Sequence, residues 1–104
     1  MEMAKYIMAI LKTNLTVVFS WGFHNPIALH NGLKFRVNGF KHKGWVSVVY
    51  NAATDLFDIT LTNRKGSETI EGIYLDNLID VIDYRVEYTG ANYEKDVTDW
   101  LKGA

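Results

Sequence analysis

The sequence predicts an α+β domain, in which a four- to five-stranded antiparallel meander sheet carries an N-terminal helix and C-terminal helices on one face. Three observations predict this class. A short helical pattern opens the chain, strand-like segments separated by turn signals follow, and helical spacing returns near residue 76. Hairpin-type connections between successive strands leave little room for the long crossovers that a parallel sheet requires.

Composition indicates one globular domain over residues 1–104, because 48% of the residues are hydrophobic and 13% are aromatic. Residues 1–52 hold six Lys and Arg against one Glu, a net charge of +5, whereas residues 53–104 hold five against eleven Asp and Glu, a net charge of −6. The chain has no cysteine, which suits a reducing cytoplasm, where we expect the protein. The apolar run over residues 6–11 is too short for a signal peptide or a membrane span, so we expect no membrane partner.

The first third of the chain is predicted as a helix, a strand and a connection. Residues 2–12 have helical spacing of their apolar side chains. Residues 15–23 then alternate with period two and are rich in β-branched and aromatic residues, which predicts a strand. Residues 24–32 are expected to be a connection, because Pro26 cannot donate to a strand ladder and Asn31-Gly32 is a turn signal.

The dipeptide Asn38-Gly39 predicts a two-residue type I′ hairpin turn between strands over residues 33–37 and 40–50. This register pairs Phe35 with His42 and sets cations opposite cations, which is mildly destabilising. A further strand is predicted over residues 55–62, with Val49 opposite Leu56. Asn63 to Gly66 is predicted as a turn, and residues 67–71 as a short edge strand.

Two helices are predicted to end the chain. The first runs from a cap at Asp76 to about residue 88, and the second covers residues 92–102. All the helices should lie on one face of the sheet, which we call the inner face. Its expected members are the apolar side chains of the strands: Leu33, Phe35, Val37, Phe40, Val46, Val48, Tyr50, Phe57 and Ile59.

The opposite, outer face is expected to be free of helices and to expose Trp45, Val49 and Leu56 together. A contiguous exposed apolar patch with a polar rim is typical of an interface. The sequence therefore predicts a small, non-enzymatic interaction module that binds a protein partner, or forms a homodimer, through these three residues.

A basic hairpin supports an alternative function on the same face. Cations beside an aromatic ring are typical of proteins that bind single-stranded nucleic acid, because the cations follow the phosphates and the ring stacks on a base. The alternative is thus a nucleic-acid-binding accessory protein whose candidate residues are Lys34, Arg36, Lys41, Lys43 and Trp45, with Arg64 and Lys65 in a nearby turn.

No motif indicates an enzyme, a metal or a cofactor. His24, His30 and His42 lack the short regular spacing of zinc ligands, and no Gly-x-Ser-x-Gly elbow or phosphate-binding loop occurs. An acidic stripe on the predicted helix near residue 76 is interpreted as a solvated face or, alternatively, as a docking site for a basic partner: Asp76, Asp80, Asp83 and Glu87.

Overall fold

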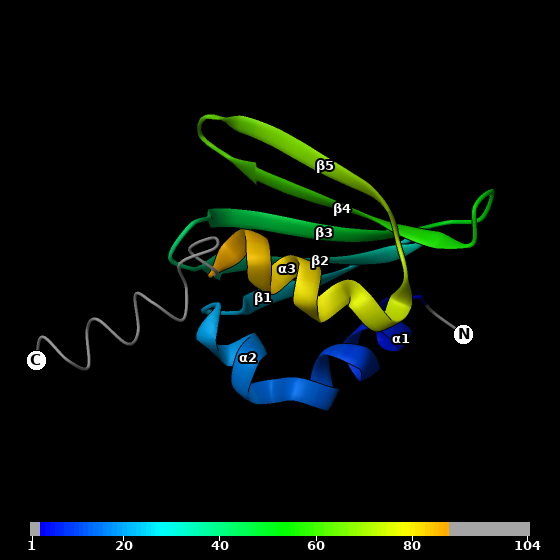
Figure 1. Cartoon of the computed structure of the whole chain (residues 1–104), viewed down its shortest axis with the longest axis horizontal. Coiled ribbons are helices and arrows are strands. Elements are labelled where there is room, and N and C mark those ends of the chain that lie inside the picture. Colours follow the sequence, from blue (N-terminus) through cyan, green and yellow to red (C-terminus); the bar gives the residue numbers. More distant parts are fainter. Residues whose placement is uncertain (1–2, 88–104) are drawn as a thin grey trace, which may run out of the picture.

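The computed structural model describes residues 3–87 and shows five strands in one antiparallel meander, in the order β1-β2-β3-β4-β5. The strands are β1 (His24–Leu29), β2 (Gly32–Asn38), β3 (Lys43–Asn51), β4 (Leu56–Asn63) and β5 (Gly66–Ile73). The helices are α1 (Met3–Leu11), α2 (Leu15–Ser20) and α3 (Leu78–Val86), with short 3₁₀ turns at Lys12–Asn14 and Leu75–Asn77. Figure 1 shows α1, α2 and α3 on the same side of the sheet. The predicted α+β meander is confirmed.

The core lies between the helices and the inner face of the sheet. Phe35, Val46, Val48, Phe57 and Ile59 are at most 4% exposed, as the alternation of the strands predicts. They pack in one cluster with the helical side chains Ala4, Ile7, Leu11, Val18, Leu78, Ile82 and Val86. The apolar stripe with period 3.6 on α3 is thus confirmed as a core face. The predicted helix over residues 92–102 lies outside the described residues.

The predicted strand over residues 15–23 is wrong, because most of this segment forms α2. The side chains of Val18 and Trp21 are buried three residues apart, whereas Leu15 is 45% and Phe19 is 65% exposed. Helical spacing therefore decides which side chains reach the core, and it overrides the β propensity of the segment. Gly22 follows the helix at φ +70°, a conformation that costs glycine little. The Trp21 carbonyl then accepts a hydrogen bond from Asn38 N at 2.7 Å.

The predicted connection over residues 24–32 contains the edge strand β1, so that prediction is also wrong. Pairing with β2 is irregular between His24 and Ile27, where Asn25 has φ +53° and Pro26 follows. A proline is tolerated here because an edge strand leaves one row of N–H groups unpaired. The two-residue turn consists of His30 and Asn31, since Leu29 pairs with Gly32.

The β2–β3 turn is longer than predicted. Asn38 pairs with Lys43, so the loop covers residues 39–42, and Gly39 N donates to His42 O at 3.0 Å. Contact with α3 explains the difference, since Lys41 N donates to Val86 O at 2.7 Å. A Cβ atom on Gly39 would lie 2.2 Å from Val86 Cγ1, so the glycine allows close approach rather than a type I′ turn. Phe40, predicted in the core, is 81% exposed, and His42, predicted opposite Phe35, is buried beside Trp45 O.

Both predicted hairpin registers are wrong by an even number of residues. Phe35 pairs with Val46, and Val48 pairs with Ile59. Because side chains alternate with period two, an even shift leaves every residue of the strands on its predicted face. The shift also removes the predicted cation pairs, since Arg36 now lies opposite Trp45 and Lys34 opposite Ser47.

The four carboxylates of the predicted acidic stripe near α3 have different surroundings in the structure. Asp76 belongs to the 3₁₀ turn before α3, so the predicted cap is wrong: Asn77 occupies the N-cap position and makes no side-chain cap bond. Asp83 Oδ1 accepts a hydrogen bond from Trp21 Nε1 at 2.9 Å, and Glu87 Oε1 accepts one from Phe40 N at 3.2 Å. Two of the four carboxylates therefore join elements of this chain, and Asp76 and Asp80 are exposed.

Candidate binding site on the outer sheet face

The strand register arranges the outer face in rows that cross the sheet. One row crosses all five strands, because each member is the Cα partner of the next: His24, Arg36, Trp45, Thr62 and Ser67. At about 4.8 Å between neighbouring strands, this row spans roughly 19 Å. The next row contains Ile27, Lys34, Ser47, Thr60 and Thr69. Both rows lie toward the end of the sheet that carries the β2–β3 and β4–β5 turns, which we call the basic end.

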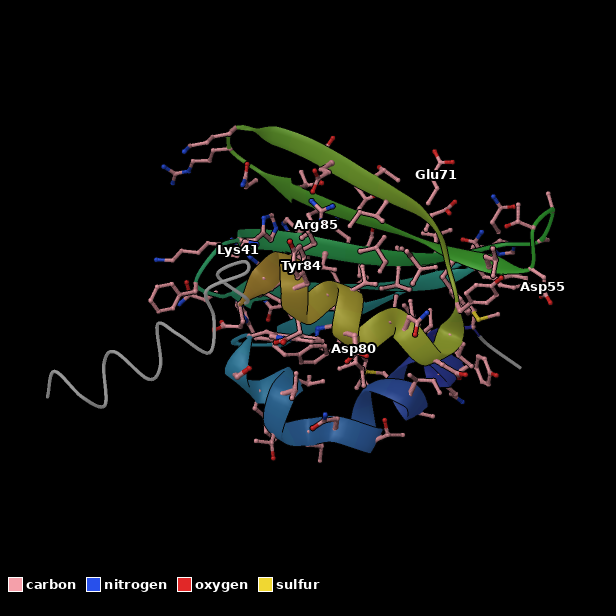
Figure 2. The ribbon with its side chains drawn as sticks, viewed as in Figure 1. Lys41, Asp55, Glu71, Asp80, Tyr84 and Arg85 are labelled. Carbon is pink, nitrogen blue, oxygen red and sulfur yellow. The ribbon has the colours of Figure 1, made fainter. Side chains whose placement is uncertain are left out.

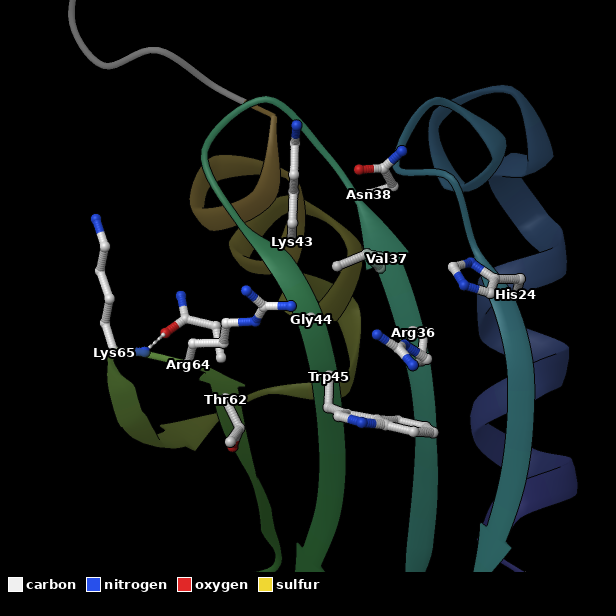
Figure 3. Close-up of a pocket in the computed structure, with 11 residues that line it drawn as sticks. His24, Arg36, Val37, Asn38, Lys43, Gly44, Trp45, Thr62, Arg64 and Lys65 are labelled. Carbon is white, nitrogen blue, oxygen red and sulfur yellow. Dashed lines mark hydrogen bonds between the residues drawn. The ribbon is translucent and has the colours of Figure 1, made fainter.

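Cations from two strands and one turn converge at the basic end. An open hollow of about 930 Å³ is lined by Arg36 on β2, Lys43 at the start of β3, and Arg64 and Lys65 in the β4–β5 turn. In Figure 3, Arg64 extends from its turn toward β3, and His24 lies on the other side of the hollow, on β1. None of the described residues lining the hollow is acidic. Like charges gathered without a neutralising carboxylate produce a local positive potential that attracts anions.

Trp45 lines the site at the end shared with Thr62 and is half-buried (Figure 3). Lys34 Nζ lies 4.5 Å and Arg36 Cζ lies 5.2 Å from the centroid of its ring. Both distances are within the range of cation–π attraction. The ring therefore holds two cations at the surface, and these stems also cover part of its apolar area.

A smaller hollow of about 310 Å³ adjoins the first and shares Trp45 and Thr62 with it. Its other lining residues are Leu29, Lys34, Ser47 and Thr60. Three hydroxyl groups from β3 and β4 thus line this smaller hollow together with Trp45. Thr60 Oγ1 also lies 3.0 Å from Thr69 Oγ1 on β5.

The structure separates the three residues of the predicted apolar patch. Trp45 and Val49 lie on one strand four residues apart, which is about 13 Å. Val49 is the partner of Asp58 rather than of Leu56, which pairs with Asn51. Val49 and Leu56 are half-buried neighbours on a diagonal at the opposite end of the sheet, which we call the apolar end.

The five residues predicted to bind nucleic acid do not all lie together. Lys34, Arg36, Lys43 and Trp45 lie together on or beside the basic end, as predicted. Lys41 lies apart, because its Nζ donates to Tyr84 O at 3.0 Å and is 4.7 Å from the Tyr84 ring centroid. Figure 2 shows Lys41 beside Tyr84 and Arg85 of α3. Its charge lies instead at the C-terminal end of α3, where a cation stabilises the helix dipole.

Sequence reasoning missed His24 and the hydroxyl groups. His24 was assigned to a loop, although its Nδ1 lies 2.6 Å from Gly22 O and its ring lines the cationic hollow. Alternation along β4 did contain the signal for Thr60 and Thr62, since both share the outer face with Asp58. The predicted register sets Thr60 opposite Trp45, whereas the structure makes Thr62 the Cα partner of Trp45 and Thr60 the partner of Ser47.

Within residues 3–87, no three His, Asp or Glu side chains are grouped so that they could hold a metal ion. Among the same residues, no helix is long and apolar enough to cross a bilayer. Comparison with known protein families, with curated proteins and with solved structures finds no match. The assignment of the candidate site therefore rests on the geometry of its own residues.

Proposed function

We propose that the protein is a non-enzymatic, cytoplasmic binding module whose basic end binds single-stranded nucleic acid. The observation that carries this proposal is the convergence of Arg36, Lys43, Arg64 and Lys65 on one hollow that Trp45 also lines. Proteins that bind single strands without sequence preference combine a positive groove with an aromatic platform in this way. The absence of cysteine supports the cytoplasmic location.

Binding by this route requires the two cations over Trp45 to rearrange. A base that stacks on the indole takes the place of Lys34 or Arg36, and the displaced cation pairs with a phosphate of the same strand. The cation–π contact that is lost is worth about 0.5–1 kcal/mol at an exposed site, whereas base stacking on an aromatic residue is worth about 1–3 kcal/mol. The exchange is therefore favourable even before the phosphate contact is counted.

The test measures the salt dependence of binding to a fluorescein-labelled 12-nucleotide oligo(U). Each phosphate contact on a single strand lowers log K by about 0.7 per decade of salt concentration. The double variant Lys43→Gln/Lys65→Gln should therefore flatten the slope by about 1.4. Lys5→Gln/Lys12→Gln is the matched control, because it removes the same charge from exposed positions of the helical layer, and it should leave the slope unchanged. Absence of binding at 50 mM salt, or equal slopes for both variants, would refute the proposal.

Association through the apolar end is a second candidate function. Val49 and Leu56 are half-buried on the face opposite α1, α2 and α3. An apolar area that no helix within residues 3–87 covers, beside polar residues, suits a protein partner or a second copy. Trp45 is about 13 Å from Val49 along β3, so a partner would have to cover both ends to use all three predicted residues.

A further inference from the structure

We infer that the single strand is RNA, and that Ser47, Thr60 and Thr62 recognise its 2′-hydroxyl groups beside Trp45. This inference rests on the proposed function and names the class of its ligand. The three hydroxyls line the smaller hollow, which adjoins the cationic hollow through the shared side chains of Trp45 and Thr62.

The two hollows fit the alternating chemistry of one polymer. Phosphates require cations, which the larger hollow supplies, and a base requires an aromatic surface, which Trp45 supplies. A ribose hydroxyl requires a partner that both donates and accepts a hydrogen bond, and Ser and Thr hydroxyls have both capacities. Sugar and phosphate units alternate along the strand, so a strand that crosses Trp45 places consecutive units in the two hollows.

DNA lacks the group that would use the hydroxyl-lined hollow. The 2′-hydroxyl is the feature by which a protein distinguishes RNA from DNA at a given site. A strand of DNA would still contact the cations and Trp45, but it would leave the three hydroxyls to water. The expected preference is therefore moderate, since one intramolecular hydrogen bond contributes a net 0.5–1.5 kcal/mol, or about 2- to 12-fold.

The positions of these three residues in the sheet agree with this role. Ser47 and Thr60 are Cα partners on adjacent strands, and Thr62 is the partner of Trp45. The Thr60–Thr69 contact uses one hydrogen-bonding capacity of Thr60 Oγ1, and a hydroxyl has one donor and two acceptor sites in total. An extended β segment also holds its side chains perpendicular to the sheet, which aligns the three groups on one surface.

The experiment compares labelled 12-nucleotide oligo(U) with oligo(dU) at one salt concentration, because these probes differ only in the 2′-hydroxyl. We expect oligo(U) to bind about five- to tenfold more tightly. The triple variant Ser47→Ala/Thr60→Val/Thr62→Val should reduce the affinity for oligo(U) to that for oligo(dU), with the affinity for oligo(dU) changed less than twofold. Valine is close to threonine in shape and favours strands, so the sheet should be retained.

Thr16→Val, at an exposed position of α2, is the matched control and should preserve the preference. Equal, salt-dependent binding of both probes would overturn the RNA assignment and leave the proposed function standing. A preference that survives the triple variant would overturn the role of the three hydroxyls. Heparin binding as tight as oligo(U) binding would show general capture of polyanions and overturn the RNA assignment. Failure to bind any of the three probes at 50 mM salt would overturn the proposed function itself.

Discussion

The basic and apolar ends of the outer face are made by the same strands, β2, β3 and β4, yet their chemistry is opposite. The basic end gathers four cations around Trp45. At the apolar end, Val49 lies opposite Asp58 and on a diagonal to Leu56 of β4. On the inner face at this same end, Tyr50 OH donates a hydrogen bond to the Asp55 carboxylate, which raises the pKa of Tyr50. Figure 2 places Asp55 and Lys41 at opposite ends of the molecule.

This contrast shows that the face of the sheet on which a strand residue lies, and the row of cross-strand neighbours to which it belongs, are determined separately. Alternation along the sequence correctly assigns Trp45, Val49 and Leu56 to one face. Only the register shows that Trp45 shares its row with Arg36 and that Val49 shares its row with Asp58. The three residues are therefore not one surface, and each end makes its own predictions.

Truncation of Trp45 should produce the largest difference in binding between the two ends. Trp45→Ala should weaken oligo(U) binding by about 1–3 kcal/mol, roughly 5- to 150-fold, because base stacking is lost. The salt slope should stay the same, since stacking involves no counterion release. Leu56→Ala, the control at the apolar end, should change the affinity less than twofold. Equal losses in the two variants, measured by fluorescence anisotropy, would mean that the ends do not differ in function.

A charge introduced at the apolar end should affect self-association alone. If the protein forms a dimer through Val49 and Leu56, sedimentation velocity at tens of micromolar protein should detect it, and Leu56→Glu should weaken it by at least about tenfold, because a buried unpaired carboxylate is costly. Oligo(U) binding should persist in this variant. A monomer at that concentration would remove the homodimer from consideration.

The smallest expected effect is on the free energy of unfolding, and it comes from Glu87, which attaches the β2–β3 turn to the end of α3. Burial raises the pKa of Glu87, with a further rise from the charge of Asp83, and the hydrogen bond from Phe40 N opposes the shift. Between the ordinary pKa of a glutamate and its higher native value, the native state binds more protons than the unfolded chain. The free energy of unfolding therefore falls as pH rises through this window, and the deficit persists at higher pH.

Glu87→Gln should thus increase stability at pH 7 by a few tenths of a kcal/mol, since solvent screens this partly exposed group. Gln Oε1 still accepts the bond from Phe40 N. The difference between variant and parent should disappear near pH 3, where glutamate is protonated in both states. Urea unfolding at the two pH values checks this. A destabilised variant at pH 7 would mean that the negative charge itself holds the turn.

The sequence predicts correctly which side chains are buried wherever the period of the apolar residues alone decides burial. Phe35, Val46, Val48, Phe57 and Ile59 were assigned to the buried face from alternation, and α3 from its 3.6-residue stripe. Each strand residue stays on its predicted face although the registers are wrong, because shifts of two or four residues preserve side-chain alternation. The fold class therefore followed from local patterns.

Tertiary contact decided the elements that the sequence did not predict. Trp21 and Val18 reach the core only in a helix, despite the strand-forming composition around them. Asn38-Gly39 is a strong signal for a two-residue turn, but α3 holds residues 39–42 in a longer loop through Val86. Alternation also places Lys41 in the candidate site, although its Nζ donates to Tyr84 O on α3. The pairing of Thr62 with Trp45 follows from a strand register that alternation alone does not determine.

The docking of the β2–β3 turn on α3 has a consequence for the thermodynamics of any ligand at the basic end. Lys43 follows a turn held by Val86 O and the Glu87 carboxylate, whereas Arg64 and Lys65 occupy a separate turn in which Asn63 Oδ1 accepts a bond from Lys65 N at 2.8 Å. One side of the hollow is thus positioned before the ligand arrives. The other side is positioned by a bond within its own turn. Loosening either attachment should therefore weaken affinity, because the freed side would lose ordering entropy on association.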